Sequence, residues 1–112
     1  MRDIDAFQAL TRRTQPKATV AEKLGHFALG LCEEAGEAAT PVKRCVYYGQ
    51  HLDEEMLTKE LGDVMWYACA LADAAGISMS KVLQANIEKL AKRYPGLGWT
   101  AEDAQARADD HA

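Results

Sequence analysis

The sequence is short of the residues that build disulfide frameworks, zinc sites and β-sheets. Its three cysteines, Cys32, Cys45 and Cys69, are odd in number and form no C-x-x-C pair. This pattern indicates neither a disulfide framework nor a zinc site, and it predicts reduced, buried thiols. Prolines are also few, and Val, Ile and Thr rarely cluster, whereas Ala, Leu, Glu and Lys are frequent. These propensities favour helix throughout the chain.

Long apolar runs and an excess of positive charge are missing as well. No window approaches about eighteen consecutive apolar residues, and the N-terminus has no apolar signal segment. We therefore expect no membrane association and a cytoplasmic location. The net charge is −4, whereas a module that binds a nucleic-acid duplex normally presents a basic face. The charge argues against duplex binding but leaves room for a small phosphorylated ligand.

The length sets the scale of the fold. A chain of 112 residues can form one modest core, and oligomerisation would help it to bury apolar surface. We predict a single domain over residues 1–112, in which the segment from about 100 to 112 forms a short C-terminal helix and an acidic tail. The expected fold is all-α, an antiparallel bundle of four to five helices completed by oligomerisation.

Apolar periodicity and capping residues locate the first two expected helices. The first covers residues 4–14, and the second begins near Thr19 and follows one apolar stripe. Pro41 is expected to kink or stop the second helix, because proline lacks an N–H and its ring crowds the preceding turn. The helix then resumes over 42–48 and ends at Gly49.

Three further helices are expected. The third covers residues 54–75 with Asp53 as its N-cap, the fourth is capped by Ser78 or Ser80 and stops before a Pro-Gly pair, and the last covers 100–108. On the third helix we expect one apolar row to face the core, made of Leu57, Leu61, Val64, Ala68, Leu71 and Ala75.

Two pairs of acidic residues carry the strongest functional signal. Glu34 and Glu37 on the second helix, and Glu60 and Asp63 on the third, are each three residues apart and therefore share a helix face. Each pair borders an apolar stripe, where a carboxylate is costly unless something neutralises it. A short connection could turn the two faces toward each other, and four converging carboxylates need a cation. Hard oxygen ligands suit Mg²⁺ or Mn²⁺.

The same acids allow two other interpretations. Most Glu and Asp residues form solvated helix faces, although two pairs at matching helical phase favour ligands. A di-iron bundle would need Glu-x-x-His on two helices, whereas Glu37 and Asp63 stand where it needs histidine. The three histidines have no ligand spacing and are expected to be surface or partly buried polar residues: His26, His51 and His111.

A candidate phosphate-binding group lies on the fourth helix. Lys89 and Arg93 are one helical turn apart, and Asn86 falls on the same stripe. Taken alone, such a pair near a helix C-terminus is more often a partner of the helix dipole. Beside a divalent-metal cluster, however, it is what a triphosphate requires. No P-loop or Ser-His nucleophile competes for this role.

Three segments together resemble the MazG-type nucleoside triphosphate pyrophosphohydrolases. They are LCEEAGE at 31–37, ELGDVMWY at 60–67 and NIEKLAKRYP at 86–95. The family pattern is E-x-x-E, a spacer, then E-x-x-D, and the 22 residues between Glu37 and Glu60 fall within its usual range. The resemblance extends over most of the chain.

The resemblance implies an all-α enzyme that uses Mg²⁺, with Mn²⁺ as the other candidate. Such an enzyme cleaves a nucleoside or deoxynucleoside triphosphate between its α and β phosphates, releasing the monophosphate and pyrophosphate, in nucleotide-pool housekeeping. Family members assemble as dimers or dimers of dimers, with active sites near subunit contacts. A homodimer or homotetramer is therefore expected.

The resemblance also assigns roles by position. It implies four metal ligands, Glu34, Glu37, Glu60 and Asp63. It implies phosphate binding by Lys89 and Arg93, with Asn86 as a contact to the substrate or the metal shell. Glu33 matches an acid beside the metal site that could position or deprotonate the attacking water, so the catalytic candidates are Glu33 and Glu34.

Some features stay open on the sequence alone. Pro41 departs from the family pattern, which usually continues a plain helix there. Trp66, Tyr67 and Trp99 are candidates for stacking on the base, although core packing is the other role for Trp66 and Tyr67. A non-catalytic helical module that binds a nucleotide or a partner helix is the alternative from another functional class.

Overall fold

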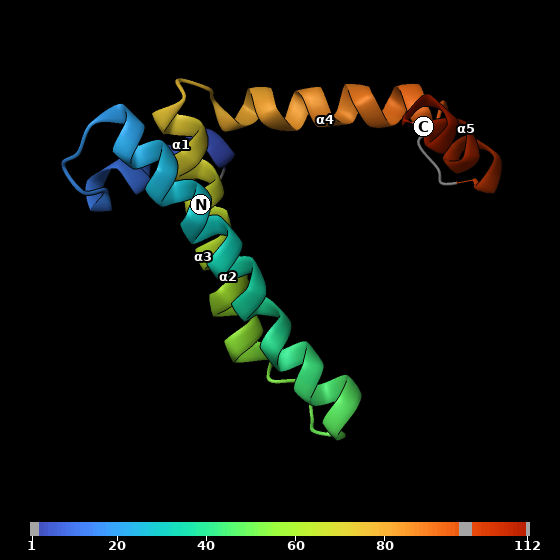
Figure 1. Ribbon diagram of the computed structural model, residues 1–112, viewed down its shortest axis with the longest axis horizontal. Helices are drawn as coiled ribbons and strands as arrows, with labels where there is room; N and C mark the ends of the chain where they lie inside the picture. The colour runs from blue at the N-terminus through green and yellow to red at the C-terminus, as the bar shows by residue number, and fades with distance from the viewer. Residues whose placement is uncertain (1–2, 97–99, 112) are drawn as a thin grey trace. The chain divides into compact units, whose positions relative to one another are not determined.

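The computed structural model of the protein describes residues 3–96 and 100–111, and every regular element in these ranges is a helix (Figure 1). The elements are α1 (Ile4–Thr11), the 3₁₀ turn η1 (Arg12–Thr14), α2 (Val20–Tyr48), α3 (Glu54–Ala74), α4 (Met79–Arg93) and α5 (Ala101–His111). The predicted all-α class with five helices is confirmed. The chain divides into two compact units, Met1–Met79 and Ser80–Ala112. That the whole chain acts as one domain stays a prediction.

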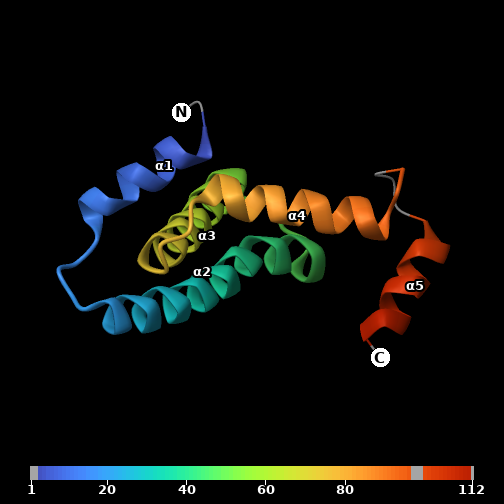
Figure 2. The same cartoon turned by 90° about the horizontal axis from the view of Figure 1, so that it is seen from above.

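Helices α2 and α3 form an antiparallel hairpin in the first unit (Figure 2). A capping box starts α2, since Thr19 Oγ1 accepts a hydrogen bond from the Glu22 N–H and the Glu22 side chain accepts one from the Thr19 N–H. Gly49 ends α2 with a φ of 66°, a left-handed conformation that glycine adopts without strain. Asp53 caps α3 by accepting from the Met56 N–H at 3.0 Å. These boundaries match the predicted ones.

The predicted stop of the second helix at Pro41 is wrong, because α2 continues through this residue as one helix of 29 residues. The predicted kink at Pro41 stays a prediction. A proline inside a helix removes one backbone hydrogen bond and costs about 3 kcal/mol or more. Here the Pro41 side chain is fully buried, and the burial of its ring offsets part of that cost. Glu34 and Glu37 therefore lie in the middle of a continuous helix rather than near its end.

The row of α3 that faces α2 is the one that carries the carboxylates, and not the expected apolar row. Ala70 of this row is fully buried. Tyr67, one turn earlier, packs directly on Gly30 of α2, where an added Cβ would overlap the tyrosine ring. Leu61, which belongs to the predicted core row, is 50% exposed. The close approach of the two helices at Gly30 thus directs the acidic row of α3 toward α2.

A buried glutamine ties α1 to the end of α3. Gln8 is 3% exposed, and its Nε2 donates to the carbonyl oxygens of Cys69 and Ile77 at 3.2 and 2.9 Å. Its Oε1 accepts from the Met79 N–H at 3.0 Å, so it satisfies a free N–H in the first turn of α4. One side chain therefore connects α1, α3 and the turn that leads to α4. Gly76 adopts a φ of 74° in that turn, as expected for a residue that ends a helix.

The second unit contains the rest of α4, together with α5. Four large apolar residues on α4 are 39–53% exposed: Val82, Leu83, Ile87 and Leu90. The start of α5 has the predicted cap, since Thr100 Oγ1 accepts a hydrogen bond from the Asp103 N–H at 3.1 Å. Both helices therefore begin close to their predicted positions.

The three cysteines are free, but they differ in burial. Cys69 is buried, Cys45 is half-buried and Cys32 is exposed, so the prediction of buried thiols holds for Cys69 alone. Burial raises the pKa of the Cys69 thiol. His26 and His51 are exposed as predicted, and the side chain of His111 lies outside the described residues. No helix in the described part of the chain is long and apolar enough to cross a membrane.

Gly30→Ala is expected to destabilise the protein, because its Cβ would overlap the Tyr67 ring and overpacking of this kind costs about 1–3 kcal/mol. Gly25→Ala on the same helix is the matched control. Apart from the neighbouring backbone of α2, no described atom lies within 4 Å of its added Cβ, and alanine stabilises a helix by about 1 kcal/mol relative to glycine. Urea unfolding followed by circular dichroism measures both free energies. Equal changes in the two variants would contradict the close contact.

Candidate metal centre

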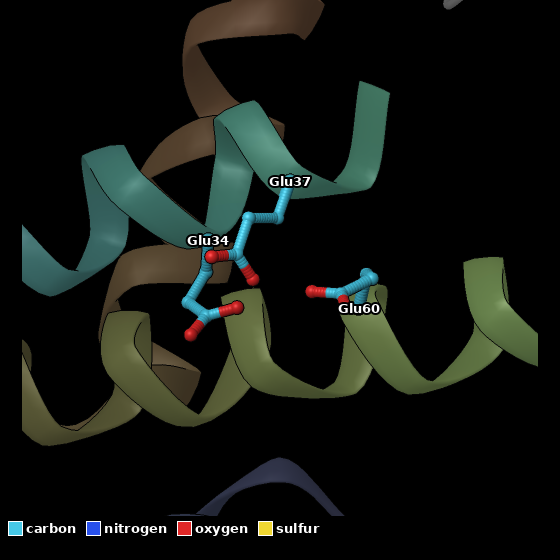
Figure 3. A group of neighbouring side chains, drawn as sticks. All are labelled: Glu34, Glu37 and Glu60. Carbon is cyan, nitrogen blue, oxygen red and sulfur yellow. The ribbon is translucent and has the colours of Figure 1, made fainter. Parts of the chain in front are cut away.

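Glu34 and Glu37 project from α2, and Glu60 projects from α3, so that their carboxylates converge (Figure 3). One carboxylate oxygen from each of these three residues lies within 4.8 Å of the others. Glu34 and Glu37 are three residues apart and lie on one side of α2, while Glu60 belongs to the row of α3 that faces them. The predicted convergence of acids from two helices is therefore present for these three residues.

Asp63 lies at the edge of this group. It is not among the three acids whose oxygens converge, but together with Glu34 it lines a cavity beside them. Its negative charge also helps to raise the pKa of Glu34. Asp63 thus adds negative charge to the same region of the hairpin, one helical turn beyond Glu60.

Two oxygens of the acidic cluster are buried without a hydrogen-bond partner, Oε2 of Glu34 and Oε2 of Glu60. Unpartnered buried polar atoms are rare in proteins because no hydrogen bond compensates the free-energy cost of their desolvation. Burial, followed by the negative charge of Glu37, raises the pKa of Glu34 to about 7, and Glu60 and Asp63 add to this effect. Without a cation, the cluster therefore keeps a proton that an ordinary glutamate loses well below neutral pH.

A divalent cation fits this set of donors. The converging groups are all carboxylates, the hard oxygen ligands that Mg²⁺ and Mn²⁺ prefer. A cation would give the two unpartnered oxygens a ligand bond and would replace repulsion among the acids by attraction. Within the described residues the cluster includes neither histidine nor cysteine, so it resembles neither a zinc site nor a di-iron site.

Two cavities adjoin the cluster along α3. One has a volume of about 310 Å³ and is lined by Thr14, Glu34, Asp63, Trp66 and Tyr67. The other has a volume of about 340 Å³ and is lined by Asp53, Glu55, Met56, Lys59 and Glu60. The first cavity has aromatic walls and the second has charged ones. The cluster therefore has two neighbouring spaces of different chemical character for the parts of a ligand.

The other predicted site residues are one glutamate on α2 and three residues on α4. Glu33 is exposed beside Glu34 on α2. Asn86, Lys89 and Arg93 lie along α4 and belong to the second unit. The catalytic role of Glu33 and the phosphate-binding role of the three α4 residues stay predictions.

Sequence reasoning did not predict the contact between the N-terminal segment and α3 beside the acidic cluster. Trp66 Nε1 donates a hydrogen bond to Thr14 Oγ1 at 3.0 Å, across 52 positions of the chain. The rings of Trp66 and Tyr67 pack edge to face at 5.0 Å, and Trp66 packs in the same way on Phe27. Their predicted core contacts are confirmed, yet both rings also line the cavity beside Glu34. No local pattern signals so distant a contact. Trp99 lies outside the described residues.

The chain is similar to known proteins over most of its length. The MazG nucleotide pyrophosphohydrolase domain family matches residues 22–98. The Gene 37 protein of Mycobacterium phage L5 is 40% identical over 78 residues, which cover 64% of this chain and 67% of the phage protein. The uncharacterized protein YvdC of Bacillus subtilis (strain 168) is 37% identical over 73 residues, which cover 57% of this chain and 69% of YvdC. No solved structure shows a significant match.

We expect the metal-free protein to lose stability as the pH rises from about 4.5 to about 7. In this range folded Glu34 keeps a proton that the unfolded chain releases, so rising pH favours unfolding. Added Mg²⁺ should raise the melting temperature more at about pH 8 than at about pH 5.5, because ligand carboxylates must be deprotonated. Thermal melts at several pH values, with and without Mg²⁺, measure both effects.

Two substitutions make this experiment specific. Glu34→Gln should weaken both effects strongly, because the glutamine amide does not titrate and cannot become a carboxylate ligand. Glu33→Gln is the control, since Glu33 is exposed at the adjacent position and its replacement should leave both effects unchanged. An unaltered pH dependence in Glu34→Gln would show that the buried cluster is not its source.

Proposed function

Because the chain belongs to the MazG nucleotide pyrophosphohydrolase domain family, we propose that it hydrolyses nucleoside triphosphates to nucleoside monophosphates and pyrophosphate in the presence of Mg²⁺. The observation that carries the proposal is the convergence of Glu34, Glu37 and Glu60, two of which bury oxygens that lack partners. A cluster of this kind suits a cation that also binds phosphate oxygens. The corresponding biological role is nucleotide-pool housekeeping.

In the proposed site four acids would hold Mg²⁺ or Mn²⁺: Glu34, Glu37, Glu60 and Asp63. When bound, the cation offsets the negative charge that develops on the phosphate oxygens and lowers the pKa of water. The two helices fix the positions of the acids before substrate arrives, so little reorganisation accompanies the reaction. Glu34 would thereby be a catalytic residue, because it would be a ligand of the cation.

The reaction adds the oxygen of water to phosphorus and breaks the P–O bond between the α and β phosphates. Pyrophosphate leaves with the electron pair of that bond, and the water loses a proton. Glu33, exposed to solvent beside the cluster, is the proposed acceptor of this proton. Lys89 and Arg93 are proposed to neutralise the remaining phosphate charge. Asn86 is proposed to contact the substrate or the metal shell.

A non-catalytic helical module that binds a nucleotide or a partner helix is the alternative function. Both proteins would bind a non-hydrolysable nucleotide in the presence of Mg²⁺, which calorimetry measures. Only the enzyme would release pyrophosphate from the natural nucleotide. Screening the common ribo- and deoxyribonucleoside triphosphates for pyrophosphate release therefore separates the two.

We also propose that the protein is a homodimer or homotetramer that assembles through an apolar face of the hairpin. At about 100° per residue, Leu24 and Leu31 of α2 lie on the same side of the hairpin as Leu57, Leu61 and Val64 of α3. None of these five side chains is buried. An uncharged apolar face suits a second copy of itself, related by a twofold axis.

Glu60→Gln and Asp63→Asn are each expected to reduce Mg²⁺-dependent pyrophosphate release by at least about 100-fold, since even outer-shell partners of a metal ligand contribute about 10- to 100-fold. Glu60→Gln should also raise the melting temperature of the metal-free protein, because it removes a charge from the repelling cluster. A coupled pyrophosphate assay and thermal melts measure the two effects.

The control for these variants is Glu54→Gln on the same helix. Glu54 is exposed and belongs to the lining of neither cavity beside the acidic cluster. Its activity should stay within about twofold of the unmodified protein. Full activity in Glu60→Gln or Asp63→Asn would refute the proposed function.

Leu61→Glu is expected to separate the oligomer into monomers, because it places a charge on the apolar face of the hairpin. Leu52→Glu is the control, since Leu52 has similar exposure, 40% against 50% for Leu61, but lies in the α2–α3 loop. Light scattering after gel filtration measures the mass. A monomeric unmodified protein would contradict the assembly.

A further inference from the structure

The aromatic cavity beside the acidic cluster has the character of a nucleoside site. Its lining combines Glu34 and Asp63 with Trp66, Tyr67 and Thr14, and no lysine or arginine is among these residues. A space without cations is poorly suited to a polyphosphate, whereas aromatic rings and a hydroxyl suit an uncharged heterocycle and sugar. Because the cavity shares Glu34 with the acidic cluster, a ligand could place its phosphates at the cluster and its nucleoside in the cavity.

Residues of α3 hold the η1 wall of this cavity, which contains Thr14, in place. Trp66 Nε1 donates to Thr14 Oγ1 at 3.0 Å, and Thr14 Oγ1 in turn donates to the Thr11 carbonyl oxygen at 3.2 Å. Arg12 Nε donates to Asp73 Oδ1 at 2.7 Å, which fixes the same turn a second time. Trp66 and Asp73 are seven residues apart and thus lie on one side of α3. The helix that supplies Glu60 and Asp63 therefore also positions the η1 wall.

We infer that the hydrogen bond between Trp66 and Thr14 sets the shape of a nucleoside-binding cavity, so that both residues determine affinity for the nucleoside part of the substrate. This inference rests on the proposed function, because it assumes that the acidic cluster receives the phosphates. It assigns Thr14 a role in substrate recognition through a segment far from the E-x-x-E and E-x-x-D motifs.

The inference makes a prediction that a purely structural role does not. If the bond only stabilised the fold, its loss would affect every ligand of the site alike. If it shapes the nucleoside cavity, its loss weakens nucleotides but spares a ligand that has phosphates and no nucleoside. Inorganic triphosphate is such a ligand, since it offers the same oxygens to the cation and leaves the aromatic cavity unused.

The test compares Trp66→Phe and Thr14→Val with the unmodified full chain in the presence of Mg²⁺. Trp66→Phe keeps an aromatic ring but removes the donor, and Thr14→Val keeps the side-chain shape but removes the acceptor. Calorimetry measures dissociation constants for inorganic triphosphate and for the α,β-imido analogues of dATP, dCTP, dGTP and dTTP. Each substitution should weaken the tightest-binding analogue roughly 3- to 10-fold, the effect of one hydrogen bond, and change inorganic triphosphate by less than about twofold.

Two further variants complete the design. The double variant Trp66→Phe/Thr14→Val should bind the analogues about as weakly as either single variant does. Each single substitution already removes the hydrogen bond, so the second substitution causes no further loss. Thr58→Val is the matched control, since Thr58 Oγ1 donates to the Glu54 carbonyl oxygen at 2.7 Å on the exposed surface of α3. It should bind every ligand as the unmodified protein does.

The outcomes separate this inference from the proposed function. Equal weakening of inorganic triphosphate and the analogues, or no weakening of either, overturns the inference. Fully additive losses in the double variant overturn it as well. Binding of the analogues without pyrophosphate release from natural nucleotides would refute the proposed activity alone, while the affinity comparison would still decide the role of Trp66 and Thr14.

Discussion

The close approach of three carboxyl groups between α2 and α3 is the constraint on which the first unit depends. Glu34, Glu37 and Glu60 converge within 4.8 Å, and such a cluster opposes the pairing of the helices that create it. Contacts on both sides of the cluster hold the hairpin together nonetheless. Pro41 is buried on one side, and on the other Tyr67 packs against Gly30. The apolar contacts thus keep the acids in place, and a cation would remove the remaining repulsion.

Features set by local chemistry were predictable from the sequence. The capping residues Thr19 and Asp53 mark helix starts because their side chains bond N–H groups three residues away. Glu34 and Glu37 share a face because of the helical period alone. Pro41 shows the limit of this reasoning, because a proline in a helix has a local cost, yet α2 continues through Pro41, whose ring is fully buried. Nothing in the neighbouring residues reveals that its ring is buried.

Features set by distant contacts were not predictable in the same way. The helical period assigns α3 two rows, one apolar and one that contains Glu60, Asp63 and Tyr67, but it does not say which row faces α2. The absence of a side chain at Gly30 decides this, since Tyr67 needs that space. Likewise, Gln8 and Thr14 contact residues 61 and 52 positions further along the chain. Periodicity and capping carry no information over such separations.

The acidic and apolar rows of α3 lie on different sides of the hairpin and differ in chemical character. The acidic row lies against α2 and opens toward η1, where Thr14 and Trp66 meet. The apolar row, with Leu61 half exposed, lies on another side of the same helix. An assembly through the apolar row would therefore cover surface that costs free energy to hydrate while leaving the η1 side of the acids open to ligands. In that assembly the apolar pattern that the sequence suggests for a core would form the contact between copies, whereas the row that looks unsuited to burial carries the acidic cluster.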